Sequence, residues 1–90
     1  MLEKTVETYF VQTVKKLGGK AYKFSSPSRR GVCDRLAVMP NGVVWFVELK
    51  RPTGKMTPLQ EIFAKDMRQL GQKYVCLWSK EDVDKWQKCL

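Results

Sequence analysis

Residues 43–50 constrain the fold of this chain more than any other segment, because they read as a buried strand that ends in charge. Five apolar residues run without interruption from Val43 to Val47, so both faces of the strand are apolar. Such strands are typical of the centre of a sheet that is covered on both sides. Glu48 and Lys50 follow two residues apart and therefore point to the same face. The pattern predicts a central strand whose end carries an acid and a base.

The rest of the chain divides into further elements by its hydrophobic spacing and turn residues. Residues 2–17 predict a helix that ends at two glycines, and its apolar face contains Leu2, Val6, Tyr9, Phe10, Val14 and Leu17. Strands are predicted over residues 20–24, 33–39 and 74–78, and a short last helix follows Ser79. With a helix that begins at Thr57, the order is α-β-β-β-α-β-α. Ninety residues in this order predict one α/β domain with a mixed sheet flanked by helices.

The second long helix has a well-marked start. Thr57 is a suitable N-cap, Pro58 suits the first helical position, and Gln60 completes a capping box. Gln60 also follows closely on the 43–50 strand, so it could touch the end of that strand. Gly71 ends the helix. The apolar stripe, which we expect to face the core, contains Leu59, Ile62, Phe63, Met67 and Leu70.

Composition limits the chemistry that the chain can perform. Histidine is absent, which excludes histidine-based triads, histidine general bases and histidine-metal nucleases. Cys33, Cys76 and Cys89 are widely spaced, so we expect reduced, partly buried thiols and neither a zinc site nor a disulfide. The net charge of +8 favours a polyanionic partner, nucleic acid first and an anionic membrane surface second. No apolar run reaches the length of a membrane span and the N-terminus does not resemble a signal peptide, so we expect a soluble intracellular protein.

The turn at residues 40–42, Pro-Asn-Gly, determines which residues of the flanking strands face each other. A three-residue loop built on a type I turn explains both the proline and the glycine, and it pairs Met39 with Val43. Counting back along the hairpin then places Asp34 directly opposite Glu48. A two-residue Asn-Gly loop would instead turn Asp34 to the other face. We favour the three-residue loop.

Two carboxylates that face each other on paired strands lie about 5 Å apart at their Cβ atoms and repel each other. A cation between Asp34 and Glu48 would remove the repulsion, and Mg²⁺ fits because it prefers oxygen ligands and retains several waters. Lys50 would then stabilise developing charge on a phosphate or orient a nucleophile. The alternative is an ordinary network of charged side chains on an exposed sheet face. The opposed Asp34 and the apolar stripe before Glu48 favour the metal site.

The first helix offers a further acid for this site. Glu7 falls at the edge of the apolar stripe and could reach the end of the sheet, and Glu3, one turn earlier, is the alternative. Acids near a helix N-terminus also interact favourably with the helix dipole, and that interpretation stays open.

Basic side chains are candidates for contacts with a DNA backbone. The strongest are Arg29 and Arg30, because their loop runs straight into the strand that carries Asp34. Arg51 and Lys55, in the loop after Lys50, are further candidates, as are Lys20 and Lys23. Any single one of them is equally compatible with a solvated surface charge.

With these residues placed, the chain resembles the VRR-NUC family, the virus-type replication and repair nucleases of the PD-(D/E)XK superfamily. The likeness spans nearly the whole chain, and its motifs are Gly31-Val32-Cys33-Asp34-Arg35-Leu36, Phe46-Val47-Glu48-Leu49-Lys50 and Leu59-Gln60. An Asp…Glu-x-Lys pattern alone is weak, but its combination with the flanking motifs and the element order is specific. Cys33 stands where the family usually has proline, which predicts a local change of backbone before Asp34.

This resemblance implies a restriction-endonuclease-like fold, with residues 1–90 as a single VRR-NUC domain, and an endonuclease of DNA that depends on Mg²⁺ or Mn²⁺. It implies Asp34, Glu48 and Glu7 as metal ligands, Lys50 as catalytic and Gln60 as a site residue. Short stand-alone members resemble Holliday-junction resolvases, so it also implies branched DNA as substrate, a homodimer, and a cytoplasmic location in a bacterial or phage-infected cell. Two other functions stay open, a non-catalytic nucleic-acid-binding module and a subunit that recruits a larger repair complex.

Overall fold

The computed structural model describes residues 3–90, with side chains from residue 5 onward. Leu2 of the predicted helical stripe and the side chain of Glu3, the alternative helix acid, lie outside this part. The predicted order α-β-β-β-α-β-α is confirmed. The elements are α1 (Glu3–Lys16), β1 (Lys20–Lys23), β2 (Arg35–Met39), β3 (Val43–Leu49), α2 (Pro58–Gln69), β4 (Lys73–Leu77) and α3 (Lys80–Lys88), with one 3₁₀ turn (Pro40–Gly42) between β2 and β3.

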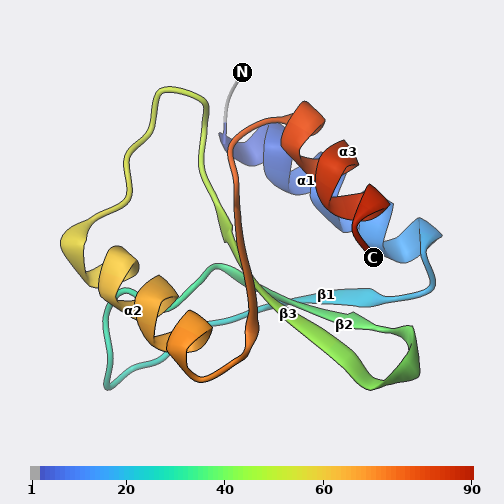
Figure 1. The fold of residues 1–90 in the computed structure, drawn as a ribbon. Coiled ribbons are helices and arrows are strands. Elements are labelled where there is room, and N and C mark those ends of the chain that lie inside the picture. Colours follow the sequence, from blue (N-terminus) through green and yellow to red (C-terminus); the bar gives the residue numbers. More distant parts are fainter. Residues whose placement is uncertain (1–2) are drawn as a thin grey trace.

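The four strands form one mixed sheet in the order β1-β2-β3-β4. The β1–β2 and β2–β3 pairs are antiparallel, whereas β3 and β4 are parallel and are joined by α2 as the crossover helix. Because β3 has a neighbour on each side, its prediction as a central strand is confirmed. Figure 1 shows α1 and α3 side by side and α2 apart from both. None of the described helices is both long and apolar enough to cross a bilayer.

Each face of the sheet carries its own apolar cluster. Alternate residues of β3, including Val47 and Leu49, are buried together with residues of α1 and α3, such as Phe10 and Trp86. Phe46 lies on the opposite face, in the cluster that α2 covers. The period-two alternation of a strand explains why an apolar run on both faces was needed here. The same alternation places Glu48, two residues after Phe46, on the face that α2 covers.

The hairpin register agrees with the three-residue loop. Met39 pairs with Val43, and Arg35 pairs with Val47 at the other end of the ladder. The conformation of the loop differs from the predicted type I turn, because Asn41 as well as Gly42 has a positive φ, 66° and 74° respectively. Asparagine tolerates this left-handed region better than other residues with a side chain. The register depends on the loop length, and so it is unaffected.

Two predictions about the elements need correction. First, β2 begins at Arg35 and not at residue 33, because the regular pairing with β3 does not extend to the two residues before Arg35. Second, the apolar stripe of α2 is only partly buried. Phe63 and Met67 pack against the sheet, whereas Leu59 and Ile62 remain 48% and 55% exposed. The helix turns Phe63, Ala64 and Met67 toward the sheet, so the side of the stripe with Leu59, Ile62 and Leu70 faces outward.

Candidate active site

The candidate site lies at the end of the β2–β3 ladder, next to its last regular pair, Arg35 and Val47. Beyond the last regular pair, the Asp34 amide donates to the carbonyl of Val47 at 3.0 Å. The Leu49 amide donates to Oδ2 of Asp34 at 2.8 Å, so a carboxylate takes the place of a backbone acceptor. Asp34 therefore bonds to the residues on either side of Glu48. Asp34 thus lies beside Glu48, held there by its side chain and not by a continued ladder, and the joint role of the two acids stays a prediction.

Glu48 is buried, with 1% of its surface exposed. Two donors approach its Oε2 atom, the Gln60 side-chain amide at 3.4 Å and the Lys50 ammonium at 3.7 Å. The Lys50 side chain is itself only 15% exposed. A buried carboxylate without such partners would be strongly destabilising, so these contacts explain why Glu48 can occupy the end of an apolar strand.

Gln60 performs both of the roles that its position allowed. The Oε1 atom of Gln60 accepts from the backbone amide of Thr57 at 2.9 Å, and the backbone amide of Gln60 donates to Oγ1 of Thr57 at 3.2 Å. These two bonds complete the predicted capping box. Because Oε1 is held by the cap, the Nε2 group of the same side chain is turned toward Glu48. The start of α2 is thereby tied to the end of β3.

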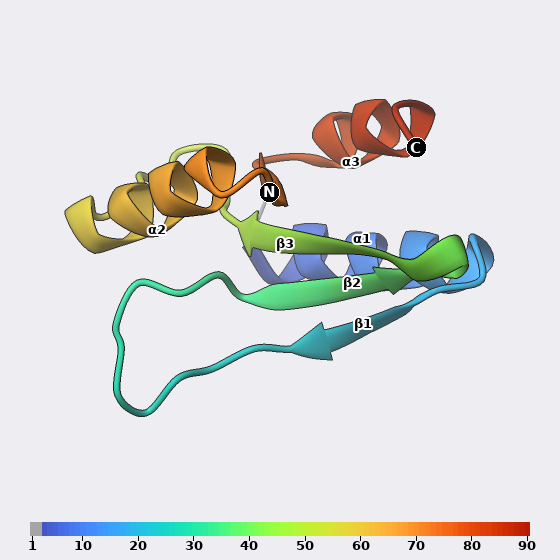
Figure 2. The ribbon, with the colours of Figure 1, turned by 60° about the horizontal axis from the view of Figure 1, so that its bottom comes forward.

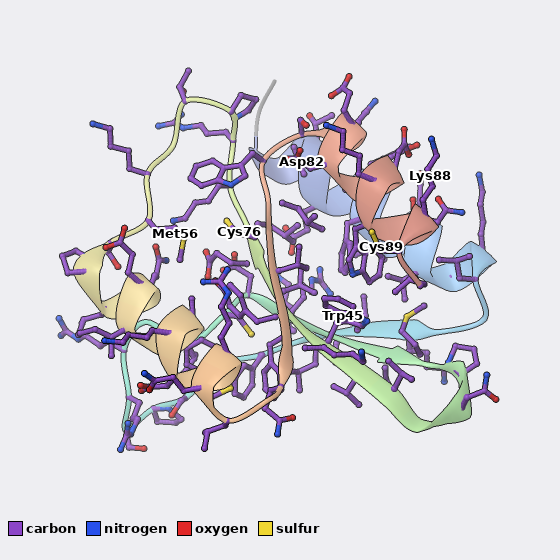
Figure 3. All side chains as sticks on the ribbon, viewed as in Figure 1. Trp45, Met56, Cys76, Asp82, Lys88 and Cys89 are labelled. Atoms are coloured by element: carbon purple, nitrogen blue, oxygen red, sulfur yellow. The ribbon has the colours of Figure 1, made fainter. Side chains whose placement is uncertain are left out.

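Two thiols lie within the electrostatic field of both acids. Burial, reinforced by the charges of Glu48 and Asp34, raises the pKa of the Cys33 thiol to about 12. The pKa of Cys76 is also raised to about 12, first by burial and then by the Glu48 charge, with Asp34 adding to it. Cys76 pairs with Glu48 across the parallel β3–β4 ladder, and Figure 3 shows its side chain on the α2 side of β4. Both carboxylates are therefore close to the same pair of thiols.

No sequence pattern pointed to Cys76 as a neighbour of the site, because the pairing of β3 with β4 spans a whole crossover. The three cysteines are free, as expected, but they differ in exposure. Cys33 is buried and Cys76 is half-buried, whereas Cys89 is exposed, so the expectation of partial burial fails for Cys89. Cys33, at the position of the family's proline, donates from Sγ to the carbonyl of Arg35 at 3.4 Å.

Glu7 has a different partner from the one expected. Its carboxylate forms an ion pair with Arg35, 2.9 Å between Oε2 and Nε. Arg35 follows Asp34 in the chain and therefore points to the other face, the one that α1 covers. Among the described residues, no three or more acidic or cysteine side chains are grouped so as to hold a metal ion. The expected set of Glu7, Asp34 and Glu48 is thus not formed, because Arg35 holds Glu7 on the α1 face.

The remaining pair of carboxylates is suited to a magnesium-like ion. Mg²⁺ is usually held by one or two carboxylates and keeps several waters, so Asp34 and Glu48 suffice as protein ligands. The protein contacts described above engage Oδ2 of Asp34 and Oε2 of Glu48. The donor set consists of oxygen atoms next to an ammonium group. These residues fit a hard divalent cation and offer nothing to a metal that needs imidazole ligands.

The predicted DNA-binding residues are all on the surface. Arg29 and Arg30 are exposed in the loop between β1 and β2, and Arg51 and Lys55 are exposed in the loop after β3. Figure 2 shows the β1–β2 loop extending from the sheet at the end where α2 lies. All four thus lie in the segment that contains Asp34 or in the loop that follows Glu48 and β3.

Comparison with known proteins supports one family. No family model matches the chain. A protein described as "Putative nuclease p44", from Acyrthosiphon pisum secondary endosymbiont phage 1, is 46% identical over 79 residues, which cover 88% of this chain and 85% of that protein. A solved structure described as "VRR_NUC domain" has a TM-score of 0.91 and 33% sequence identity, and the match covers 96% of this chain and 94% of the other. The chain therefore belongs to the VRR-NUC family of nucleases.

Proposed function

We propose that this chain is a Mg²⁺- or Mn²⁺-dependent endonuclease that hydrolyses phosphodiester bonds in branched DNA. The observation that carries the proposal is the position of Asp34, bonded to both neighbours of the buried Glu48, with the Lys50 ammonium 3.7 Å from Glu48. Membership of a nuclease family supports an enzyme that acts on nucleic acid. The identity of the metal and of the DNA substrate goes beyond that membership.

Each residue of the site has a distinct role in this proposal. Asp34 and Glu48 provide the carboxylate ligands, and Gln60 holds the orientation of Glu48. When bound, the divalent cation polarises the scissile phosphate and lowers the pKa of the attacking water. Lys50 stabilises the negative charge that develops on the phosphate. The N-terminus of α2, which begins beside Gln60, adds the positive end of a helix dipole.

The surface charge supports DNA as the substrate. The net charge of +8 attracts a polyanion, and Arg29, Arg30, Arg51 and Lys55 are exposed and could contact phosphates. Contacts of this kind position the backbone without reading bases. Selection of branched DNA then depends on the shape of the substrate and not on its sequence.

A labelled four-way junction, a flap and a linear duplex, each incubated with Mg²⁺, Mn²⁺ or EDTA, test the proposal. We expect cutting of the branched substrates with either metal and none in EDTA. Lys50→Ala should bind DNA and lose cutting, whereas Lys88→Ala, which changes an exposed lysine at the end of α3, should retain both binding and cutting. Binding in all three conditions without any cutting would instead identify a non-catalytic module. Cutting by Lys50→Ala at the wild-type rate would show that the site is wrongly assigned.

We further propose that the active form is a homodimer, since a two-fold axis could present two sites to two symmetric strands of a junction. Light scattering on the purified chain measures its solution mass directly. A mass of two chains, and loss of paired cuts when the dimer is diluted, are expected. A monomer that still makes paired cuts in a junction would contradict the dimer and leave the chemistry of the site unaffected.

A further inference from the structure

A groove of about 470 Å³ lies between the β1–β2 loop and the outer side of α2. Arg29 and Arg30 line it from the loop, and Leu59, Ile62 and Phe63 line it from the helix, together with Asp66. Its volume falls within the range of about 300–1,000 Å³ that is typical of small-ligand sites. The nuclease chemistry proposed above does not use it.

The apolar side of the groove consists of exposed aliphatic side chains. Leu59 and Ile62 lie three residues apart on α2, so their side chains are neighbours, and they are 48% and 55% exposed. Exposed apolar side chains that are contiguous and line a groove are a feature of ligand-binding grooves. Phe63 forms a deeper wall, where its ring packs against Phe46 and Tyr74.

The residues that line the groove are close along the chain to residues of the candidate site. Gly31 has a φ of +83° and packs so closely on α2 that a Cβ atom there would lie 2.6 Å from the carbonyl carbon of Leu59. The next residue of α2 is Gln60, which holds Glu48, and three residues after Gly31 the chain reaches Asp34. A ligand in the groove would therefore contact the same two segments that carry Gln60 and Asp34.

The charges around the groove favour an anionic ligand with an apolar part. Within the part of the chain that the structure describes, neither Arg29 nor Arg30 takes part in an ion pair, and both are exposed. Arginine combines planar donors for phosphate with a face that stacks on aromatic rings. Asp66 lies two turns further along α2 than Leu59, so it would repel a second phosphate at that end and could accept from a base amino group.

We propose that this groove binds one unpaired nucleotide next to the scissile phosphate, with its base against Leu59 and Ile62 and its phosphate at Arg29 and Arg30. The position relative to the scissile phosphate rests on the proposed nuclease function, but the binding itself does not. A stacked and paired base cannot enter such a groove until it leaves the helix, and this costs least where the base is already unpaired. Exposed aliphatic side chains that contact unstacked bases are a known means of recognising distorted DNA. The groove would thus confer selectivity for branched or bulged DNA.

The test measures binding in EDTA, so that it does not depend on cutting. The probes are a duplex with a single bulged 2-aminopurine and the same duplex fully paired, each titrated with the wild-type chain. We expect a preference of about tenfold or more for the bulged duplex, as loss of one base contact typically causes, and a rise in 2-aminopurine emission as the base leaves the stack. The double variant Leu59→Ser, Ile62→Ser should lose both effects and keep its affinity for the paired duplex.

The control is Leu70→Ser, which removes an exposed leucine at the C-cap of α2, away from the groove, and should retain the preference. Both variants change only exposed side chains, and circular dichroism verifies that they fold. An equal loss of affinity for both duplexes, or an unchanged preference in the double variant, would overturn the proposal. So would conversion of a dimer to a monomer by the double variant, because a second copy would then cover the groove. A wild-type chain that cuts junctions without the binding preference refutes only the groove, whereas preference without cutting refutes only the nuclease function.

Discussion

Replacement of Gln60 by glutamate separates the two roles of this side chain. The carboxylate of Gln60→Glu can still accept from the Thr57 amide, so the capping box that starts α2 is retained. The group that now faces Glu48 is an oxygen, where the wild type has the Nε2 donor 3.4 Å from Oε2. The variant therefore removes one hydrogen bond to a buried carboxylate and adds a like charge beside it.

The expected cost follows from these two changes. A hydrogen bond to a charged group contributes about 1.5–3 kcal/mol, and the long distance here places this one near the lower end. Two carboxylates about 4 Å apart repel by up to about 4 kcal/mol at an effective dielectric constant near 20, of which Lys50 offsets part. We expect the free energy of unfolding to fall by about 3 kcal/mol at pH 7 without divalent metal.

Urea denaturation followed by circular dichroism measures this change, and Gln12→Glu on the exposed side of α1 is the control for added charge. The difference in unfolding free energy between the wild type and Gln60→Glu should become smaller as the pH falls through the carboxyl range. Protonation of one of the two carboxyl groups, at position 48 or 60, removes the repulsion and restores a hydrogen-bond donor. Added Mn²⁺ should also reduce the difference, since a cation neutralises the pair. If Gln60→Glu costs no more than Gln12→Glu at pH 7, Gln60 does not support Glu48 and the reasoning is refuted.

Three further predictions concern the surroundings of the site. Gly31→Ala should cost about 3 kcal/mol, because it combines a positive φ with a close approach to α2, whereas Gly42→Ala has open space and should cost about 1 kcal/mol in thermal unfolding. Cys33 and Cys76 should resist alkylation at pH 8 while the exposed thiol of Cys89 reacts, and rapid alkylation of all three would contradict the burial of the first two. The contribution of these two protonated thiols to the free energy of unfolding should be full below about pH 9 and decline as the pH rises toward 12, because the folded state raises the pKa of both to about 12. Glu7→Gln should lower stability by about 1 kcal/mol without changing Mn²⁺ affinity in calorimetric titration, and a tenfold loss of affinity would restore Glu7 as a ligand.

Features that depend on a few adjacent residues could be predicted from the sequence. The loop at residues 40–42 determined the hairpin register through its length, although its backbone conformation differed in detail. The capping box of Thr57 and Gln60 and the N-cap at Ser79 were predictable for the same reason. In each case the paired residues lie four or fewer positions apart, so the relevant geometry is already present in the local chain.

Only the tertiary structure decided which side chains reach the site. Asp34 was expected within a strand, but its carboxylate replaces a backbone acceptor and ends the ladder. Glu7 lay at a suitable helical angle, yet its partner is Arg35, and that choice depends on how α1 packs on the sheet. Cys76 lies close to Glu48 because a crossover brings β4 beside β3.

The same distinction applies to the outer side of α2. The sequence by itself determined that the helix has an apolar stripe, since the spacing of its residues follows from the helical repeat. Which part of the stripe is buried depends on the rotation of the helix against the sheet, and that rotation leaves Leu59 and Ile62 exposed beside the arginine loop. Periodicity reports the direction of a side chain around its own helix axis, whereas burial depends on contacts between segments that are distant in the chain.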